Sequence, residues 1–289
     1  AIKNVIEKIL ENHFEPTAIT DFLLRKKPRF SNGTKNPILK PGLSARDFIN
    51  SIILAANELD NSYLCIQGPP GAGKTFTARN VIGNLMSKGK RIGISSNSHK
   101  AIINLMSGVA DHLLDNNIGG ELIKIGGENE DPIFDKSNVI FRKDGKAYSD
   151  KLNEMPVCIG GTAWLFCNSA LTEEEGVEKF DYLFIDEAGQ VSLANLVGMS
   201  GIARNIILMG DQMQLGQPSQ GSHPDESGES ILDYLLQGQA TISPEMGIFL
   251  PKTYRMHPDL CSVVSSQVYD SRLVSSESTT RHILDIQSN

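Results

Sequence analysis

The segment 68–75 reads Gly68-Pro69-Pro70-Gly71-Ala72-Gly73-Lys74-Thr75, a complete G-x-x-x-x-G-K-[ST] pattern. It follows a short apolar run at 63–66 and precedes apolar residues at helical spacing. A glycine-rich turn between a strand and a helix lets successive backbone N–H groups face an anion. The sequence therefore predicts a phosphate-binding loop that opens a helix at 74–87, against the alternative of an ordinary Gly/Pro turn.

The last residues of this loop carry its chemistry. Lys74 can reach the β- and γ-phosphates of a nucleoside triphosphate, and Thr75 can offer its hydroxyl to Mg²⁺. We expect the nucleotide to contact Gly68, Pro69, Pro70, Gly71, Ala72, Gly73, Lys74, Thr75 and Phe76.

A second acidic motif supplies the partner that such a loop requires. Residues 180–187 read Phe-Asp-Tyr-Leu-Phe-Ile-Asp-Glu, an apolar strand that ends in two carboxylates. At the carboxyl end of a strand, Asp186 can point towards the metal and Glu187 towards the water that attacks the γ-phosphate. An Asp-Glu pair in a solvated turn is the simpler reading, but the loop at 68–75 favours the catalytic one.

The fold class follows from the alternation of elements. Six apolar runs read as buried strands, at 63–67, 91–95, 122–125, 157–159, 182–185 and 205–209. Helical patterns occupy 74–87, 99–113, 193–199 and 230–236. Buried strands separated by helices predict an α/β fold, a parallel sheet with helices on both faces.

Composition narrows the class of protein. The chain has 289 residues, 40% of them apolar, enough for a sizeable core, and none of its apolar runs approaches the ~20 residues of a membrane span. The net charge of −7 argues weakly against a nucleic-acid binder, although a total charge says nothing of a local groove. Cys65, Cys158, Cys167 and Cys261 form no C-x-x-C pair, so we expect a cytoplasmic protein.

Three further motifs carry a family resemblance. Residues 186–190 read Asp-Glu-Ala-Gly-Gln, 210–215 read Gly-Asp-Gln-Met-Gln-Leu, and 253–258 read Thr-Tyr-Arg-Met-His-Pro. In this order behind the phosphate loop, they resemble superfamily 1 helicases, in the branch of the nonsense-mediated-decay RNA helicase and the flap-processing nuclease-helicase. The segments 98–102, 161–164 and 186–195 look most like the bacterial group with a RecB-like nuclease domain. The resemblance runs from about 44 to 274.

The resemblance implies a RecA-like P-loop NTPase that uses ATP and Mg²⁺, and it implies a role for each matching residue. Gln214 resembles the glutamine that contacts the γ-phosphate and the attacking water, and Asp211 orients its loop. Arg255 resembles the arginine that neutralises charge in the transition state, and Tyr254 the aromatic residue that stacks on adenine. The expected catalytic set is Lys74, Asp186, Glu187, Gln214 and Arg255, with Thr75 and Asp186 on the metal and Tyr254 on the base.

Single-stranded nucleic acid, with DNA favoured over RNA, is the partner that the resemblance implies. The positions that match the family's backbone-binding segments are Ser95, Ser96, Asn97, His99, Gly161, Thr162 and Ala163. Small hydroxyl and amide donors at strand ends suit phosphate contacts. Trp164 could stack on a base, but a single Trp beside Leu165 and Phe166 favours a core position.

The chain also departs from the family pattern. Between Pro41 and Leu64 it has no Gln that could read the adenine edge, so adenine selectivity is open. We expect an N-terminal helical appendage and linker at 1–42, a first RecA-like ATPase domain at 43–240 with an insertion at 126–155, and the start of a second RecA-like domain at 241–289. The remainder of that second lobe and a nuclease domain are expected in a longer polypeptide.

Two functions compete at this point. One is an ATP-driven motor that moves along a single strand, 5′ to 3′ by resemblance. The other is an ATP-gated binding or scaffold module without processive movement. The complete catalytic set favours the motor. An unrelated P-loop switch would leave the motifs around Gln214 and Tyr254 unexplained, and the chain has no N-K-x-D guanine signature.

Overall fold

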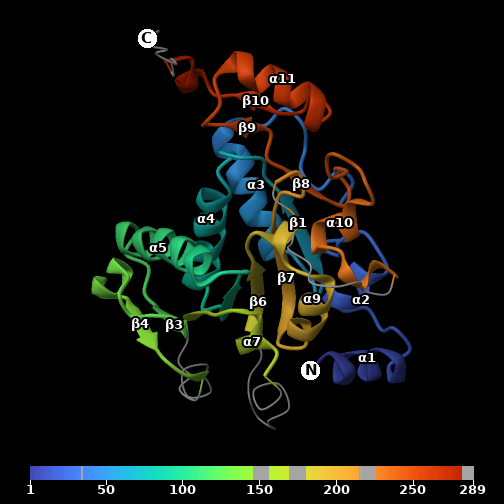
Figure 1. Cartoon of the computed structure of the whole chain (residues 1–289), viewed down its shortest axis with the longest axis vertical. Coiled ribbons are helices and arrows are strands. Elements are labelled where there is room, and N and C mark those ends of the chain that lie inside the picture. The colour runs from blue at the N-terminus through green and yellow to red at the C-terminus, as the bar shows by residue number, and fades with distance from the viewer. Residues whose placement is uncertain (34, 146–155, 169–179, 215, 217–224, 282–289) are drawn as a thin grey trace, which may run out of the picture.

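A twisted parallel sheet forms the centre of the molecule (Figure 1). The computed structural model describes residues 1–33, 35–145, 156–168, 180–214, 216 and 225–281. Within these residues the main sheet has eight strands in the order β4-β3-β5-β2-β6-β7-β1-β8, and every pairing in it is parallel. The strands are β1 (Tyr63–Gln67), β2 (Ile92–Ser95), β3 (Glu121–Ile125), β4 (Val139–Arg142), β5 (Val157–Gly160), β6 (Phe180–Ile185), β7 (Ala203–Gly210) and β8 (Gly247–Phe249).

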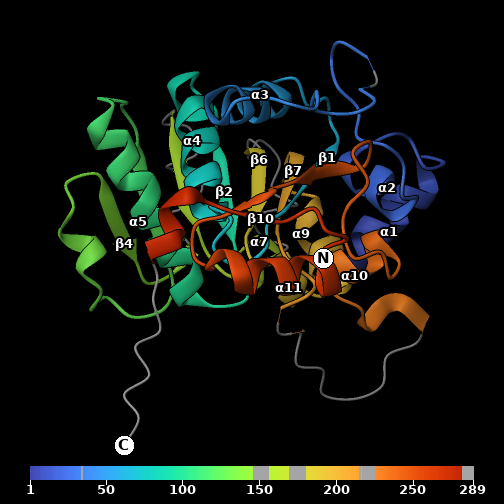
Figure 2. The same cartoon turned by 90° about the horizontal axis from the view of Figure 1, so that it is seen from above.

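Helices cover both faces of this sheet (Figure 2). The first face carries α3 (Ala45–Asn57), α4 (Lys74–Ser87) and α5 (His99–Asp115), and the second carries α2 (Ala18–Leu23), α9 (Leu193–Ser200) and α10 (Ile231–Leu236). Each face has its own apolar cluster, because every residue of β1 is buried and side chains alternate between the faces. The expected α/β fold with a RecA-like sheet is confirmed.

Two local signals explain where the helices begin. Gly73 has a φ of +84° and starts α4 directly after the phosphate loop, a backbone conformation that suits glycine. The Ser98 hydroxyl accepts a hydrogen bond from the N–H of Ala101 and so caps α5. Both helix starts follow the carboxyl end of a strand, β1 for α4 and β2 for α5.

The sheet is larger than the sequence pattern indicated. The expected insertion at 126–155 contains a 3-10 helix η1 (Pro132–Asp135) and the edge strand β4, which pairs with β3; residues 146–155 lie outside the described residues. Strand β8 pairs with β1 although it lies past residue 240, where we expected the first domain to end. Both strands are short, and β8 lies far from its partner β1 in sequence, so periodicity does not reveal them.

The first 42 residues also differ from an appendage. Helix α2 packs on the second face of the sheet, where Phe22 is buried and its ring contacts the ring of Tyr63 in β1. Helix α1 (Ile2–Glu11) packs its Val5 and Ile9 side against the same core. The structure therefore joins this segment to the sheet.

The remaining elements are short. They are α7 (Ala163–Phe166), η3 (Ala188–Gln190), η4 (Asp225–Gly228), β9 (Lys252–Thr253), α11 (Pro258–Val268), β10 (Val274–Ser275) and η5 (Glu277–Arg281). Strands β9 and β10 form a separate parallel pair, and Figure 1 shows them with α11 at one end of the molecule. In the described part of the chain, no helix is both long and apolar enough to span a membrane.

Candidate functional site

The phosphate loop lies at the carboxyl end of β1. The N–H of Gly68 donates to the carbonyl of Gly210 at the end of β7 (2.9 Å), which fixes the start of the loop to the neighbouring strand. Lys74 folds back over the loop, and its Nζ donates to the carbonyl of Gly68 (3.0 Å). The ammonium group therefore lies at the start of the loop, beside the N-terminus of α4, where an anion would bind.

Asp186 and Lys74 meet at this edge of the sheet. Burial is the main reason why the pKa of Asp186 rises to about 6, and the neighbouring charge of Glu187 raises it further. A backbone hydrogen bond from Glu187 and the charge of Lys74 act in the opposite direction. The N–H of Asp186 donates to the carbonyl of Ser95 (2.9 Å), which holds the acid at the end of β6. Two carboxylates and one ammonium thus share a partly dry site.

Mg²⁺ fits the donors available here. Thr75 and Asp186 offer a hydroxyl and a carboxylate oxygen, the hard ligands that Mg²⁺ takes together with phosphates. The raised pKa of Asp186 is evidence that its charge lacks full compensation without a cation. The expected metal residues therefore have suitable chemistry.

Asp211 connects the Gln214 loop to the C-terminal segment. Its Oδ2 accepts hydrogen bonds from the Gln214 amide (3.1 Å) and from the hydroxyl of Tyr269, which follows α11 (2.7 Å). Asp211 itself is buried. The expected orienting contact between Asp211 and Gln214 is present, and Tyr269 is a third member that the sequence did not indicate.

The segment 253–255 packs directly on the phosphate loop. The Thr253 hydroxyl donates to the carbonyl of Pro70 (2.9 Å), and the N–H of Tyr254 donates to the carbonyl of Gly71 (2.9 Å). A Cβ added at Gly71 would lie 2.5 Å from Cβ of Arg255, so only glycine fits there. The structure therefore brings Tyr254 and Arg255 to the loop, and Thr253 is a positioning residue that the motif reading missed.

A cavity of about 660 Å³ lies beside the loop. Its lining comes from α3, the loop, the first turn of α4 and the segment after β8: Leu43, Ala45, Phe48, Ile49, Ala72, Gly73, Phe76, Thr77, Leu250, Pro251, Lys252, Tyr254 and Val274. Most of these side chains are apolar, and the volume suits a ligand the size of a nucleobase and sugar.

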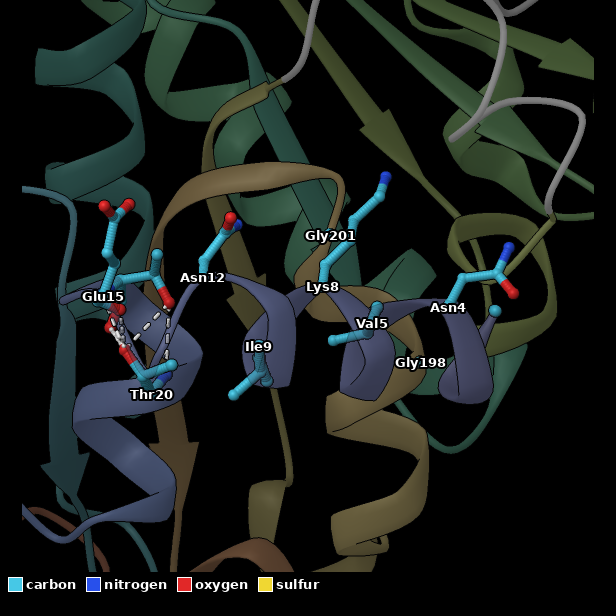
Figure 3. Close-up of a pocket in the computed structure, with 11 residues that line it drawn as sticks. Asn4, Val5, Lys8, Ile9, Asn12, Glu15, Thr20, Gly198 and Gly201 are labelled. Carbon is cyan, nitrogen blue, oxygen red and sulfur yellow. Dashed lines mark hydrogen bonds between the residues drawn. The ribbon is translucent and has the colours of Figure 1, made fainter.

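A second cavity, of about 220 Å³, lies between α1, the start of α2 and α9 (Figure 3). Val5 and Ile9 of α1 line it, together with Gly198 of α9 and Gly201, which follows that helix. A Cβ added at Gly201 would contact Cγ2 of Val5 at 3.5 Å, so this cavity is a space in helix packing and contains none of the expected site residues.

The residues expected to contact nucleic acid lie at or just after the carboxyl ends of β2 and β5, which are neighbours in the sheet. Asn97 is exposed and His99 is partly exposed at the start of α5. Ser95 and Ser96 are buried, so in this conformation their hydroxyls do not reach solvent. After β5, Gly161 is also buried, and its N–H donates to the carbonyl of Ile94 (3.0 Å).

Trp164 corrects one expectation. Its side chain is 88% exposed, whereas Phe166 is fully buried, so the core position expected for Trp164 is wrong. The single turn of α7 explains the difference, because residues two apart in a helix point to nearly opposite sides. Thr162 and Ala163, just before this ring, are partly exposed.

Comparison with known proteins agrees with the fold and the phosphate site. The model of the AAA domain family matches residues 52–227. The chain is similar to the DNA replication ATP-dependent helicase/nuclease dna2 of Schizosaccharomyces pombe, at 26% identity over 271 residues that cover 91% of this chain and 18% of that protein. It is 27% identical over 262 residues to the DNA polymerase alpha-associated DNA helicase A of the same yeast, covering 76% of this chain and 38% of that protein.

The chain thus spans well under half of either relative. Among solved structures, an arterivirus nonstructural protein 10 (helicase) in complex with DNA aligns with a TM-score of 0.44 and 15% identity, over 73% of this chain and 41% of that one. Because the family model covers more than half of the chain and includes both the phosphate loop and Asp186, the chain belongs to the AAA domain family and is a P-loop ATPase with a RecA-like fold.

Proposed function

We propose that this chain is the ATP-hydrolysing part of a motor that moves along single-stranded nucleic acid, with DNA favoured. The observation that carries the proposal is the packing of the segment 253–255 on the phosphate loop, whose Lys74 interacts electrostatically with Asp186 at the end of β6. This arrangement brings a loop lysine, two carboxylates and an arginine to one edge of the sheet, which is the set that phosphoryl transfer from a nucleotide needs.

Each residue has a separate task in this proposal. Lys74 neutralises the β- and γ-phosphates, and Glu187 orients the attacking water. Gln214, whose amide donates a hydrogen bond to Asp211, contacts the γ-phosphate. Arg255 stabilises the negative charge that develops in the transition state. Thr75 and Asp186 would hold Mg²⁺, which would supply neutralisation of the phosphate charge.

The cavity beside the loop accommodates the base in this proposal. Tyr254 and Phe76 line it with aromatic rings, and both side chains are about half exposed. Ring faces of this kind hold a planar base by stacking.

Nucleic acid contacts the ends of β2 and β5 in this proposal. Asn97, His99, Thr162 and Ala163 offer polar and backbone groups there, and Trp164 offers an exposed ring for stacking. The names of the relatives, which are DNA helicases, support DNA as the substrate. The proposal also includes features of the longer protein. These are membership of the branch with a RecB-like nuclease, a complete second lobe, 5′ to 3′ movement and strand separation.

Steady-state ATP hydrolysis tests the motor proposal. We expect poly-dT to increase ATP turnover by the full-length protein, and Glu187→Gln to abolish turnover while nucleotide binding persists. Glu11→Gln, on the exposed end of α1, is the matched control and should behave as the unmodified protein. A rate of ATP hydrolysis that neither poly-dT nor poly-rU changes would refute the motor proposal. Nucleotide-dependent binding of poly-dT without any turnover would favour the scaffold function instead.

A further inference from the structure

Lys124 is a buried cation on the strand next to one edge of the sheet. It lies on β3, which pairs with β4 on one side and β5 on the other, and its side chain is fully buried. Its Nζ donates three hydrogen bonds, to the carbonyls of Ile125 (2.8 Å) and Gly126 (2.7 Å) and to Nδ1 of His99 (2.9 Å). An ammonium has three protons to donate, so these neutral acceptors use all of them.

The third bond fixes the tautomer of His99. An ammonium group cannot accept a hydrogen bond, so Nδ1 of His99 must accept and the ring proton must lie on Nε2. Protonation of the ring would place a second cation 2.9 Å from the first. Burial and the charge of Lys124 accordingly lower the pKa of His99 below its usual value, and burial lowers the pKa of Lys124 to about 8. At neutral pH the pair is thus a charged lysine and a neutral imidazole.

Two glycines hold the ring from its other side. Gly126 and Gly127 have φ values of +73° and +82°, which favour glycine. A Cβ added at Gly127 would lie 3.1 Å from both Cγ and Nδ1 of His99, closer than ordinary side-chain contacts. The ring therefore rests against a bare backbone turn while Lys124 sets its protonation, and its orientation is fixed from two directions.

The surroundings of the ring are acidic and open. The hollow at this place is lined by His99, Lys100, Gly127, Glu128, Glu130 and Asp131. Lys100 forms an exposed ion pair with Asp131 (3.5 Å), and Glu128 and Glu130 are exposed. These carboxylates would favour a protonated imidazole, and burial of the ring together with the charge of Lys124 opposes them.

We propose that Lys124 is a positioning residue that holds His99 as a neutral donor, whose Nε2–H binds a backbone oxygen of single-stranded nucleic acid. The inference rests on the proposed function, because His99 follows the end of β2 where that function has the strand. A neutral N–H donor contributes a directional bond but no charge, so its contribution does not follow pH near neutrality and does not add to the salt dependence of binding.

Ring-nitrogen NMR and oligo-dT binding test the two halves of this inference. In the free chain, NMR of the imidazole nitrogens should show the Nε2–H form of His99 and titration below the usual range. Between pH 7.5 and pH 5.5, the oligo-dT affinity of the unmodified chain should change less than that of Lys124→Met. For Lys124→Met we expect the ring to titrate nearer its usual range, and affinity to rise about three- to tenfold over that interval because the contact becomes charge-assisted.

Substitutions at His99 complete the test without touching the buried lysine. His99→Gln places an amide donor near the position of Nε2 and should retain affinity within about twofold, whereas His99→Leu should lose about fivefold, the value of one hydrogen bond. Neither should change the salt slope. Lys136→Met, which removes an ammonium bonded to Ser107 and Asp111, is the control. Its oligo-dT affinity should follow pH in the same way as that of the unmodified chain.

The outcomes separate the inference from the proposed function. If the unmodified chain binds oligo-dT but His99→Leu binds it equally well, the inference is wrong and the proposed function stands. A protonated or Nδ1–H ring at pH 7 also overturns the inference. If the unmodified chain binds no oligo-dT at any pH, both fail. If Lys124→Met does not fold, two measurements still test the inference. They are the NMR spectrum of His99 in the unmodified chain and the oligo-dT affinities of His99→Gln and His99→Leu.

Discussion

Asp186→Asn should stabilise the nucleotide-free protein while it removes ATP hydrolysis. The pKa of Asp186 rises from its ordinary value of 3.8 to about 6, chiefly because of burial. At about 1.4 kcal/mol for each pH unit, this difference corresponds to about 3 kcal/mol of folding free energy. Because the residue is partly exposed and solvent screens its charge, we expect about 1.5–3 kcal/mol.

The sign of the pH dependence follows from the raised pKa. Between about pH 4 and pH 6 the folded state binds more protons at Asp186 than the unfolded state does, so stability falls as the pH rises. The contribution is fully present below pH 4 and lost above pH 6. An asparagine has no such titration, so the advantage of Asp186→Asn should grow from pH 4 to pH 6 and stay constant above it.

Urea unfolding in EDTA without nucleotide measures this difference at pH 4.5, 5.5 and 7. Asp181→Asn is the matched control at the other end of β6, because the Asp181 carboxylate accepts from the N–H of Arg91 (2.9 Å) and its loss should destabilise the protein. Mg²⁺ and ADP should then stabilise the unmodified protein more than Asp186→Asn. Equal or lower stability of Asp186→Asn at pH 7 would refute the electrostatic reasoning.

Three further predictions concern the loop, the base cavity and the exposed ring. Gly71→Ala should weaken nucleotide binding in a fluorescent-nucleotide titration, because the new Cβ would lie 2.5 Å from Cβ of Arg255. Gly42→Ala is the control and should leave nucleotide binding unchanged, because Gly42 has a similar φ of +76° but no atom within 4 Å of the added Cβ. In competition experiments, the affinities for ATP, GTP, CTP and UTP should lie within about tenfold of one another, because the base cavity is mostly apolar. Tyr254→Ala should weaken the binding of all four nucleotides. A stronger preference for ATP would contradict this prediction. Oligo-dT should quench the fluorescence of Trp164, the one tryptophan of the chain, and an unchanged spectrum at saturation would show that the ring makes no contact.

The phosphate site could be predicted from the sequence because its geometry is local or follows from sheet topology. The glycine pattern at 68–75 sets the loop, and the carboxyl ends of parallel strands meet at one edge, so Lys74 and Asp186 had to lie close together. The contact between Asp211 and Gln214 is equally local, since only two residues lie between them.

Other features depended on contacts between distant segments. The pairing of β8 with β1, and the packing of α2 on the sheet, leave little trace in short stretches of sequence. Trp164 was misjudged because its apolar neighbours suggested a core, whereas the rotation between residues along one helical turn decides which side chain is buried. Lys124 reads as a polar interruption of a strand, and only the structure shows the imidazole that accepts a hydrogen bond from it.

The end of β2 lies between the nucleotide site and the segment proposed to bind nucleic acid. The carbonyl of Ser95 accepts the N–H of Asp186, so a shift of the acid at the phosphates acts on the backbone two residues before Asn97. His99 follows at the start of α5, and its ring is bound to Lys124 on β3. A rigid hydrogen-bonded path of this kind transmits a displacement only where its elements have two arrangements. The buried, fully bonded lysine is the fixed end of this path, so under the proposed function a displacement that accompanies ATP hydrolysis would begin at the other end, at Asp186 and the segment 253–255 that packs on the loop.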